Sequence, residues 1–152
     1  MIFQTNCELL EDTLKLGEVV GRACKGGEVF ELISDLGGGK TAFVRGMARG
    51  IETEDDVSSP SFTINNTYVG KQLTLEHFDF YRLDEAGVVA DELREDIYKP
   101  DTVVVVEWGN IVHNVLPANT IRVKIEPQES ETREITFTYK EENAYLFSEL
   151  HI

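Results

Sequence analysis

Residues Ser34–Thr41 combine a run of glycines with a lysine and a threonine, a composition suited to binding phosphate. The glycines at 37–39 let the backbone turn tightly and direct its N–H groups inward. Lys40 adds a positive charge and Thr41 a hydroxyl at the start of an amphipathic segment, whose helix dipole would present its positive end to the same point. An apolar strand at 29–33 precedes the turn. Strand, turn and helix in this order predict a P-loop that holds a polyphosphate with its magnesium.

Ser34 departs from the literal motif G-x-x-x-x-G-K-[ST], because it occupies the position of the first glycine. A side chain there requires a backbone conformation that residues other than glycine can adopt. A glycine-rich turn that binds no ligand is the plain alternative, and the flanking strand and helix make it the less favoured one.

Two acidic residues follow or end apolar strands and could complete a magnesium site. Glu107 comes directly after the run TVVVV at 102–106, which is typical of a strand buried on both faces of a parallel sheet. In P-loop proteins an acid at such a strand end helps to hold the metal, and an acid that only caps the strand end is the structural alternative. Asp79 lies between two phenylalanines, where a carboxylate is costly to bury unless it is paired or near a metal. It could orient the attacking water or complete the metal shell; an ion pair with Arg82 is the structural alternative.

Other polar side chains near these motifs admit plainer interpretations. Ser61 and Thr63 follow the P-loop helix, where a hydroxyl often senses the γ-phosphate in switch-type NTPases, although Ser-Pro-Ser also makes an ordinary turn. Arg45 and Arg49 could form a basic patch near the phosphates, but a solvated helix face is favoured. His77 is interpreted as a packed strand residue rather than a catalytic base.

Hydrophobic periodicity and turn signals predict the elements that position these residues. Residues 5–8, Thr-Asn-Cys-Glu, have the spacing of a capping box and predict a helix from there to about Cys24. The other expected elements are strands at 2–4, 29–33, 102–106, 121–125 and 135–139, a hairpin of 61–68 with 73–80, and helices at 40–51, around 90–98, at 110–115 and at 141–150. This order predicts an α/β, P-loop NTPase-like three-layer fold, with a mostly parallel central sheet, added antiparallel strands and a single domain over 1–152.

The composition is strongly acidic, with 28 Asp and Glu against 14 Lys and Arg and a net charge of −14. Such a surface repels nucleic acid and anionic lipid at long range, although simple solubility also explains it. No run approaches the ~20 apolar residues that span a membrane, and no signal peptide is visible, so a cytoplasmic protein is expected. Cys7 and Cys24, about 25 Å apart in one predicted helix, are expected to be reduced.

Four segments together resemble the TsaE (older name YjeE) family: LGGGKTAFVRGMARGI, SSPSFTI, HFDFYRL and VVEWG. The resemblance runs from the first helix to about Pro117. It implies a small P-loop ATPase domain that is required for the threonylcarbamoyl modification of adenosine 37, beside the anticodon, in certain tRNAs. HFDFYRL and the EW that follows an apolar strand carry most of its specificity.

The resemblance implies a role for each matching residue. Asp79 would be the residue on which hydrolysis depends, with Lys40 on the β and γ oxygens of ATP. Mg²⁺ would be held by Thr41 and Glu107. The nucleotide would contact Asp35, Leu36, Gly37, Gly38, Gly39, Lys40, Thr41, Ala42 and, near the C-terminus, Arg133, while the switch segment would contain Ser61 and Thr63.

The family also implies partners. TsaE proteins act with TsaD and TsaB, which with TsaC perform the transfer, so this chain would reach tRNA indirectly. Two alternatives stay open. A small-molecule kinase shares the P-loop and the size range, and a nucleotide-gated binding module would use ATP only to order residues 58–69 for a partner.

Overall fold

The computed structural model describes residues 1–35, 37, 39–60, 63–85 and 87–150. The strands are β1 (Ile2–Cys7), β2 (Val29–Ile33), β3 (Asn65–Val69), β4 (Thr74–Asp79), β5 (Thr102–Glu107), β6 (Ile121–Pro127) and β7 (Arg133–Thr138). The helices are α1 (Leu10–Ala23), α2 (Lys40–Gly50) and α3 (Gly87–Ile97), with 3₁₀ helices η1 (Gly109–Val112) and η2 (Glu141–Phe147).

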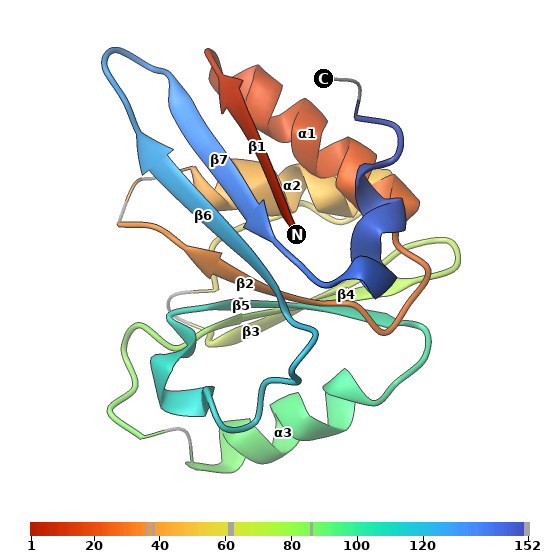
Figure 1. The fold of residues 1–152 in the computed structure, drawn as a ribbon. Helices are drawn as coiled ribbons and strands as arrows, with labels where there is room; N and C mark the ends of the chain where they lie inside the picture. Colours follow the sequence, from red (N-terminus) through yellow and green to blue (C-terminus); the bar gives the residue numbers. More distant parts are fainter. Residues whose placement is uncertain (36, 38, 61–62, 86, 151–152) are drawn as a thin grey trace.

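Within these residues the strands form one seven-stranded sheet with the order β1-β7-β6-β2-β5-β4-β3 (Figure 1). The central strands β6, β2, β5 and β4 pair in parallel, and antiparallel strands extend the sheet at both edges. The P-loop strand β2 lies between β5 and β6, where the strand order reverses. In open α/β sheets, ligands bind in the crevice at the carboxyl ends of such strands.

Helices cover both faces of the sheet and create two apolar clusters. On one face α1, α2 and η2 pack on the sheet around Phe30, Phe43 and Phe137. On the other face α3 and η1 cover the part made by β2, β5 and β4, around Phe78 and Leu93 (Figure 1). The predicted three-layer α/β fold is therefore confirmed. The strand TVVVV is buried on both faces as predicted, because each face has its own layer.

At the N-terminus, the strand expected at 2–4 and the helix ending near Cys24 are confirmed, but the predicted start of that helix at residues 5–8 was wrong. β1 continues to Cys7 because it pairs with β7, so the chain is extended where the capping box was expected. α1 begins at Leu10, and the backbone N–H of Leu9 donates to Asp12 Oδ2 (2.9 Å). Cys7 therefore ends a strand while Cys24 follows α1, and both are buried and free. The hairpin of β3 and β4 is confirmed, and the two short helices expected after β5 and β7 are 3₁₀ helices.

Four glycines let α1 and α2 touch backbone to backbone. A Cβ added at Gly17 would lie 2.3 Å from the Phe43 carbonyl oxygen, and one at Gly46 would lie 2.1 Å from the Leu14 carbonyl oxygen. The same crowding holds at Gly21 and Gly50, one turn further along each helix. This close contact fixes α2, and with it the P-loop lysine, against the first helix.

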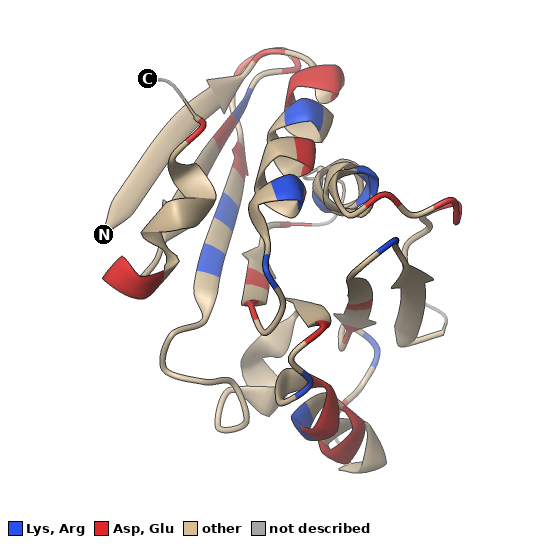
Figure 2. Ribbon diagram, turned by 90° about the vertical axis from the view of Figure 1, so that its right-hand side faces the viewer, with Lys and Arg blue, Asp and Glu red and all other residues tan. Residues whose placement is uncertain are grey.

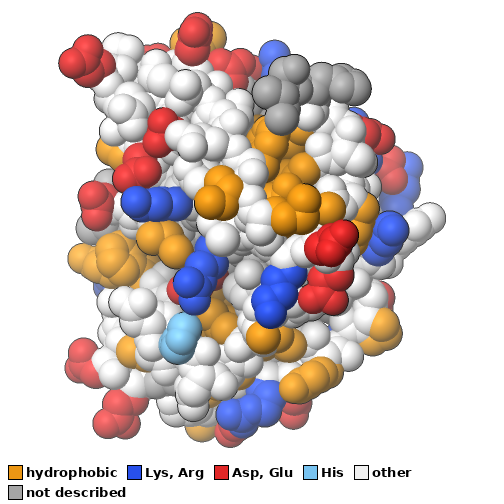
Figure 3. Space-filling view, in the orientation of Figure 1, with side chains coloured by type: hydrophobic (Ala, Val, Ile, Leu, Met, Phe, Trp, Pro, Cys, Tyr) orange, Lys and Arg blue, Asp and Glu red, His pale blue; other side chains and the backbone are white. Residues whose placement is uncertain are grey.

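Charge is distributed unevenly over the surface. Acidic side chains gather on α3 (Figure 2). The face in Figure 3 has basic side chains near its centre next to acidic ones, in keeping with the ion pairs Arg122–Glu31 (3.5 Å) and Lys124–Glu126 (2.9 Å). In the part of the chain that is described, every helix is too short or too polar to cross a membrane.

Candidate functional site

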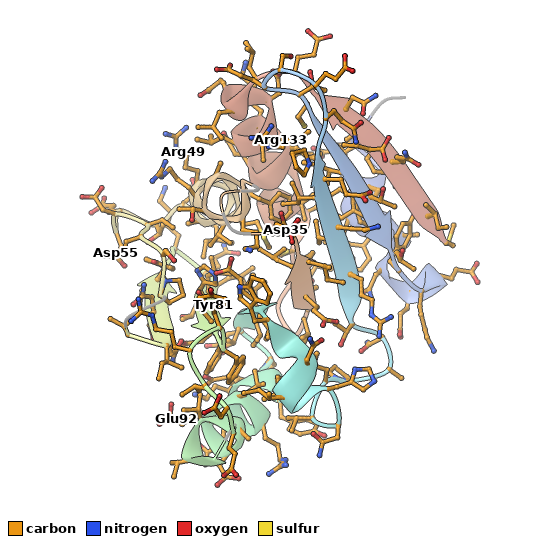
Figure 4. All side chains as sticks on the ribbon, turned by 90° about the vertical axis from the view of Figure 1, so that its left-hand side faces the viewer. Asp35, Arg49, Asp55, Tyr81, Glu92 and Arg133 are labelled. Atoms are coloured by element: carbon orange, nitrogen blue, oxygen red, sulfur yellow. The ribbon has the colours of Figure 1, made fainter. Side chains whose placement is uncertain are left out.

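The P-loop connects β2 to α2 at the carboxyl edge of the sheet, which faces the viewer in Figure 4. Gly37 (φ 78°) and Gly39 (φ 100°) occupy the left-handed region, which glycine adopts without strain. Ser34 keeps a φ outside that region, so a serine fits there at no backbone cost. This explains how the motif tolerates its departure from glycine. Leu36 and Gly38, predicted to contact the nucleotide, lie outside the described residues.

A hollow of about 300 Å³ opens where the P-loop meets the ends of β4 and β5. It contains the predicted residues Lys40, Asp79 and Glu107. Its lining is Leu10, Gly37, Gly39, Lys40, Thr41, Ala42, Arg45, Ser59, Asp79, Glu107 and Trp108. Arg45 and Arg49 are both exposed, as expected of a solvated helix face, but Arg45 also lines this hollow whereas Arg49 does not (Figure 4).

The two acids stand side by side. Asp79 and Glu107 are Cα partners in the parallel register of β4 and β5. Both are nearly enclosed, with 4% and 3% of their surface exposed. One oxygen of Asp79 accepts the backbone N–H of Tyr81 (3.0 Å), which orients that carboxylate. The register therefore brings together two carboxylates that are 28 positions apart in the sequence.

Lys40 lies between the loop and the acids. Its Nζ donates to the carbonyl oxygens of Ser34 (3.0 Å) and Asp35 (3.4 Å) and is 4.0 Å from Glu107 Oε1. The ammonium also lies 4.9 Å from the centre of the Trp108 ring, within range of a cation–π contact. A buried positive charge thus faces the centre of the hollow.

His77 makes a contact that its sequence context does not predict. It is fully buried, as expected of a packed strand residue, but its Nε2 lies 2.9 Å from Glu107 Oε2. The two residues are on adjacent strands, 30 positions apart. The sequence offers only two signals for this contact: an acid at the end of β5 and a histidine two residues before Asp79. Neither signal shows that the two side chains meet, because their contact depends on the register of β4 with β5.

Trp108 follows Glu107 in a left-handed conformation (φ 56°), which is uncommon for a bulky residue. Its ring contacts that of Tyr81, with 4.9 Å between centroids. Tyr81 is 47% exposed and lies at the same edge of the sheet as the P-loop (Figure 4). The aromatic pair forms one wall beside the hollow.

Three other predicted residues lie apart from this lining. Asp35 is exposed and contributes its carbonyl oxygen to Lys40. Thr63 donates its hydroxyl to Asn66 Oδ1 (2.8 Å), and Ser61 lies outside the described residues. Arg133 donates to the backbone oxygens of Glu131 and Thr132, at the same edge as Asp35 (Figure 4).

The donor set suits magnesium rather than a metal held by protein alone. In the described part of the chain there is no cluster of three or more His, Cys, Asp or Glu that could hold a metal ion. Mg²⁺ is usually bound by one or two protein oxygens together with substrate phosphates and water. The Thr41 hydroxyl and the Glu107 carboxylate, both in the hollow, fit that sparse pattern.

Comparisons with known proteins point to one family. The family model described as "Threonylcarbamoyl adenosine biosynthesis protein TsaE" matches residues 7–135. The TsaE protein of Treponema pallidum is 37% identical over 126 residues, covering 83% of this chain and 93% of that protein. The TsaE protein of Bacillus subtilis is 34% identical over 128 residues, covering 84% and 80%. The crystal structure of Bacillus subtilis YdiB has a TM-score of 0.78 and 28% identity, covering 99% of this chain and 94% of that one.

Proposed function

The chain belongs to the TsaE family of threonylcarbamoyl adenosine biosynthesis proteins, and on this premise we propose that it binds ATP with Mg²⁺ and hydrolyses it. The observation that carries the proposal is the meeting of Lys40, Asp79 and Glu107 in one hollow at the P-loop. A P-loop by itself accounts only for binding phosphate. Two adjacent buried carboxylates add the groups that a hydrolytic site needs.

The P-loop and Lys40 bind the phosphates of ATP. The Lys40 ammonium donates to the carbonyl oxygens of Ser34 and Asp35. Phosphate oxygens are stronger acceptors because they are charged, so they take the place of these carbonyl oxygens when ATP binds. Thr41 and Glu107 would hold Mg²⁺, which would supply neutralisation of the charge on the β- and γ-phosphates. Arg45, exposed at the rim of the hollow, adds positive charge near the same groups.

Asp79 orients the attacking water. The water oxygen would form the new bond to the γ-phosphorus as the bond from that phosphorus to the bridging oxygen breaks, with its electron pair staying on ADP. The attacking water gives up one proton to a phosphate oxygen, and ADP and phosphate leave. Burial makes the negative charge of Asp79 effective, and the Tyr81 N–H fixes its direction. Positioning and electrostatics of this kind account for most phosphoryl-transfer catalysis.

The chain acts on tRNA through protein partners of the TsaD and TsaB type in the cytoplasm. Its net charge of −14 supports an indirect role, because an acidic surface repels the phosphates of tRNA. Turnover of ATP then drives the cycle of the partner pair, and the chain itself makes no threonylcarbamoyl bond.

The test measures ATP binding and phosphate release by the purified chain, with and without a TsaD–TsaB pair. Wild type should bind ATP with Mg²⁺ and hydrolyse it slowly, and the pair should raise that rate. Lys40→Ala should lose both activities, while Lys15→Ala, an exposed lysine on α1, should keep them. Unchanged binding by Lys40→Ala would overturn the assignment of the site. A phosphorylated nucleoside or sugar in place of free phosphate would favour a kinase.

A further inference from the structure

We propose that His77 is a positioning residue that gives the site its preference for magnesium, by holding one of the two oxygens of Glu107. The inference rests on the proposed function, in which Glu107 is a metal ligand. It concerns a side chain that takes no part in binding phosphate, because His77 is fully buried and lies outside the lining of the hollow.

The contacts of Glu107 divide its two oxygens between two partners. Oε2 lies 2.9 Å from His77 Nε2, and Oε1 lies 4.0 Å from Lys40 Nζ. An ionised carboxylate only accepts hydrogen bonds, so the His77 Nε2 carries the proton and donates it. Oε2 is thereby engaged inside the protein, and Oε1 is the oxygen on the side of the P-loop lysine.

The hydrogen bonds of His77 point to Glu107 as the reason for a histidine at this position. Within the described residues the other ring nitrogen, Nδ1, has no hydrogen-bond partner. A buried polar atom without a partner costs free energy, so an apolar side chain would fill the same space at a lower cost. The one polar bond that the ring does make is the bond to Glu107. The polar ring of His77 is therefore explained by its hydrogen bond to the Glu107 carboxylate, since an apolar residue would be enough for the packing of β4.

Holding one oxygen has a consequence for the choice of metal. Magnesium requires a small octahedral shell of single oxygen ligands, whereas calcium accepts six to eight ligands and takes carboxylates through both oxygens. A Glu107 that offers Oε1 alone suits the first ion and disfavours the second. Hydrogen-bond partners of metal ligands typically account for about 10- to 100-fold in metal affinity.

The matched variants are His77→Gln and His77→Met. Glutamine and methionine have nearly the same size, and only glutamine can donate a hydrogen bond to Glu107. The chain contains one tryptophan, and Trp108 lines the hollow, so its fluorescence reports nucleotide binding. Titrations of ATP with Mg²⁺, with Ca²⁺ and with neither ion give the preference between the two metals without relying on hydrolysis.

For His77→Met we expect the affinity for MgATP to fall about 10-fold or more, while the affinity for CaATP changes little. The ratio of the MgATP affinity to the CaATP affinity then falls by the same factor. His77→Gln should stay within about 3-fold of wild type, because it restores the donor. Equal ratios in wild type and His77→Met would overturn the inference, as would an equal loss in both variants. If His77→Met does not fold, His77→Leu provides the same comparison.

Failure of the proposed function gives a different result. A wild-type chain that binds no nucleotide with either ion contradicts the ATPase assignment itself. A wild-type chain that binds MgATP while the His77 variants match it in metal preference contradicts only the role of His77.

Discussion

Asp79 and Glu107 are register partners at the carboxyl ends of two adjacent parallel strands, and each is almost completely enclosed by protein. Two carboxylates in this position repel each other unless positive charge lies near them. Lys40 Nζ, 4.0 Å from Glu107 Oε1, supplies one such charge. The pair thus forms an anionic edge that a metal ion bound to nucleotide would complete.

Replacing Asp79 with asparagine should separate hydrolysis from binding. The change keeps the size of the side chain and its acceptor for the Tyr81 N–H but removes the charge. We expect kcat to fall about 100-fold or more, with ATP affinity within about 3-fold of wild type. Phosphate release and nucleotide titration measure the two effects, and Glu92→Gln on the exposed face of α3 is the control. Hydrolysis at the wild-type rate would show that Asp79 does not act on the water.

Alanine at Gly46 should destabilise the fold through the helix contact. Its Cβ would lie 2.1 Å from the Leu14 carbonyl oxygen, so the two backbones must separate. Overpacking of this kind costs about 1–3 kcal/mol. The higher helix propensity of alanine offsets about 1 kcal/mol of that cost. Because the clash is with backbone on both helices, we expect a cost near the upper end of the range and a net destabilisation. Urea unfolding should give a lower midpoint than wild type. Lys15→Ala, on the exposed side of α1, should change the free energy of unfolding by less than about 0.5 kcal/mol. A midpoint at or above that of wild type for Gly46→Ala would contradict the helix contact described here.

Tyr145→Phe should loosen the attachment of η2. The Tyr145 hydroxyl donates to Glu28 Oε1 (2.6 Å), and burial together with that carboxylate raises the pKa of Tyr145, so the hydroxyl remains a donor. A hydrogen bond to a charged group contributes about 1.5–3 kcal/mol when buried, and we expect about 1–2 kcal/mol at this half-buried position. Thermal or urea unfolding measures the loss. Tyr139→Phe is the matched control, because no hydrogen bond of its hydroxyl is present among the described residues. Equal losses in the two variants would mean that the Glu28 contact adds nothing.

Glu76→Gln should become more stable relative to wild type as the pH rises. Burial raises the pKa of Glu76, against a lowering by the Thr67 hydroxyl, which lies 3.0 and 2.8 Å from its two oxygens. A carboxyl whose pKa is raised on folding contributes stability below its ordinary pKa and loses it as the pH rises through the raised value. The free energy of unfolding of Glu76→Gln minus that of wild type should therefore increase between pH 4 and pH 7. Glu129→Gln, on an exposed turn, should show no such trend. A difference between wild type and Glu76→Gln that is independent of pH would contradict the effect of burial.

Local signals were enough to predict the centre of the fold and failed where distant strands decide the structure. The strand before the P-loop, α2 and the buried run of β5 follow from residues next to one another in sequence. The extension of β1 to Cys7 depends on β7, more than 120 positions away, so a local capping pattern was misleading. The same limit applies to the site. Glu107 could be predicted from its place after a buried strand, whereas its bond to His77 depends on the register of β4 with β5.

The glycine contact between α1 and α2 also affects how mutational data on this chain should be interpreted. Gly17, Gly21, Gly46 and Gly50 have no space for a side chain, although none of them lines the hollow. In a saturation screen scored by growth or activity, these positions should tolerate change as poorly as the P-loop itself. Their variants would be lost through low protein abundance, whereas variants of Asp79 would remain abundant and inactive. A screen that records abundance beside activity would therefore separate the residues that build this protein from those that carry out its chemistry.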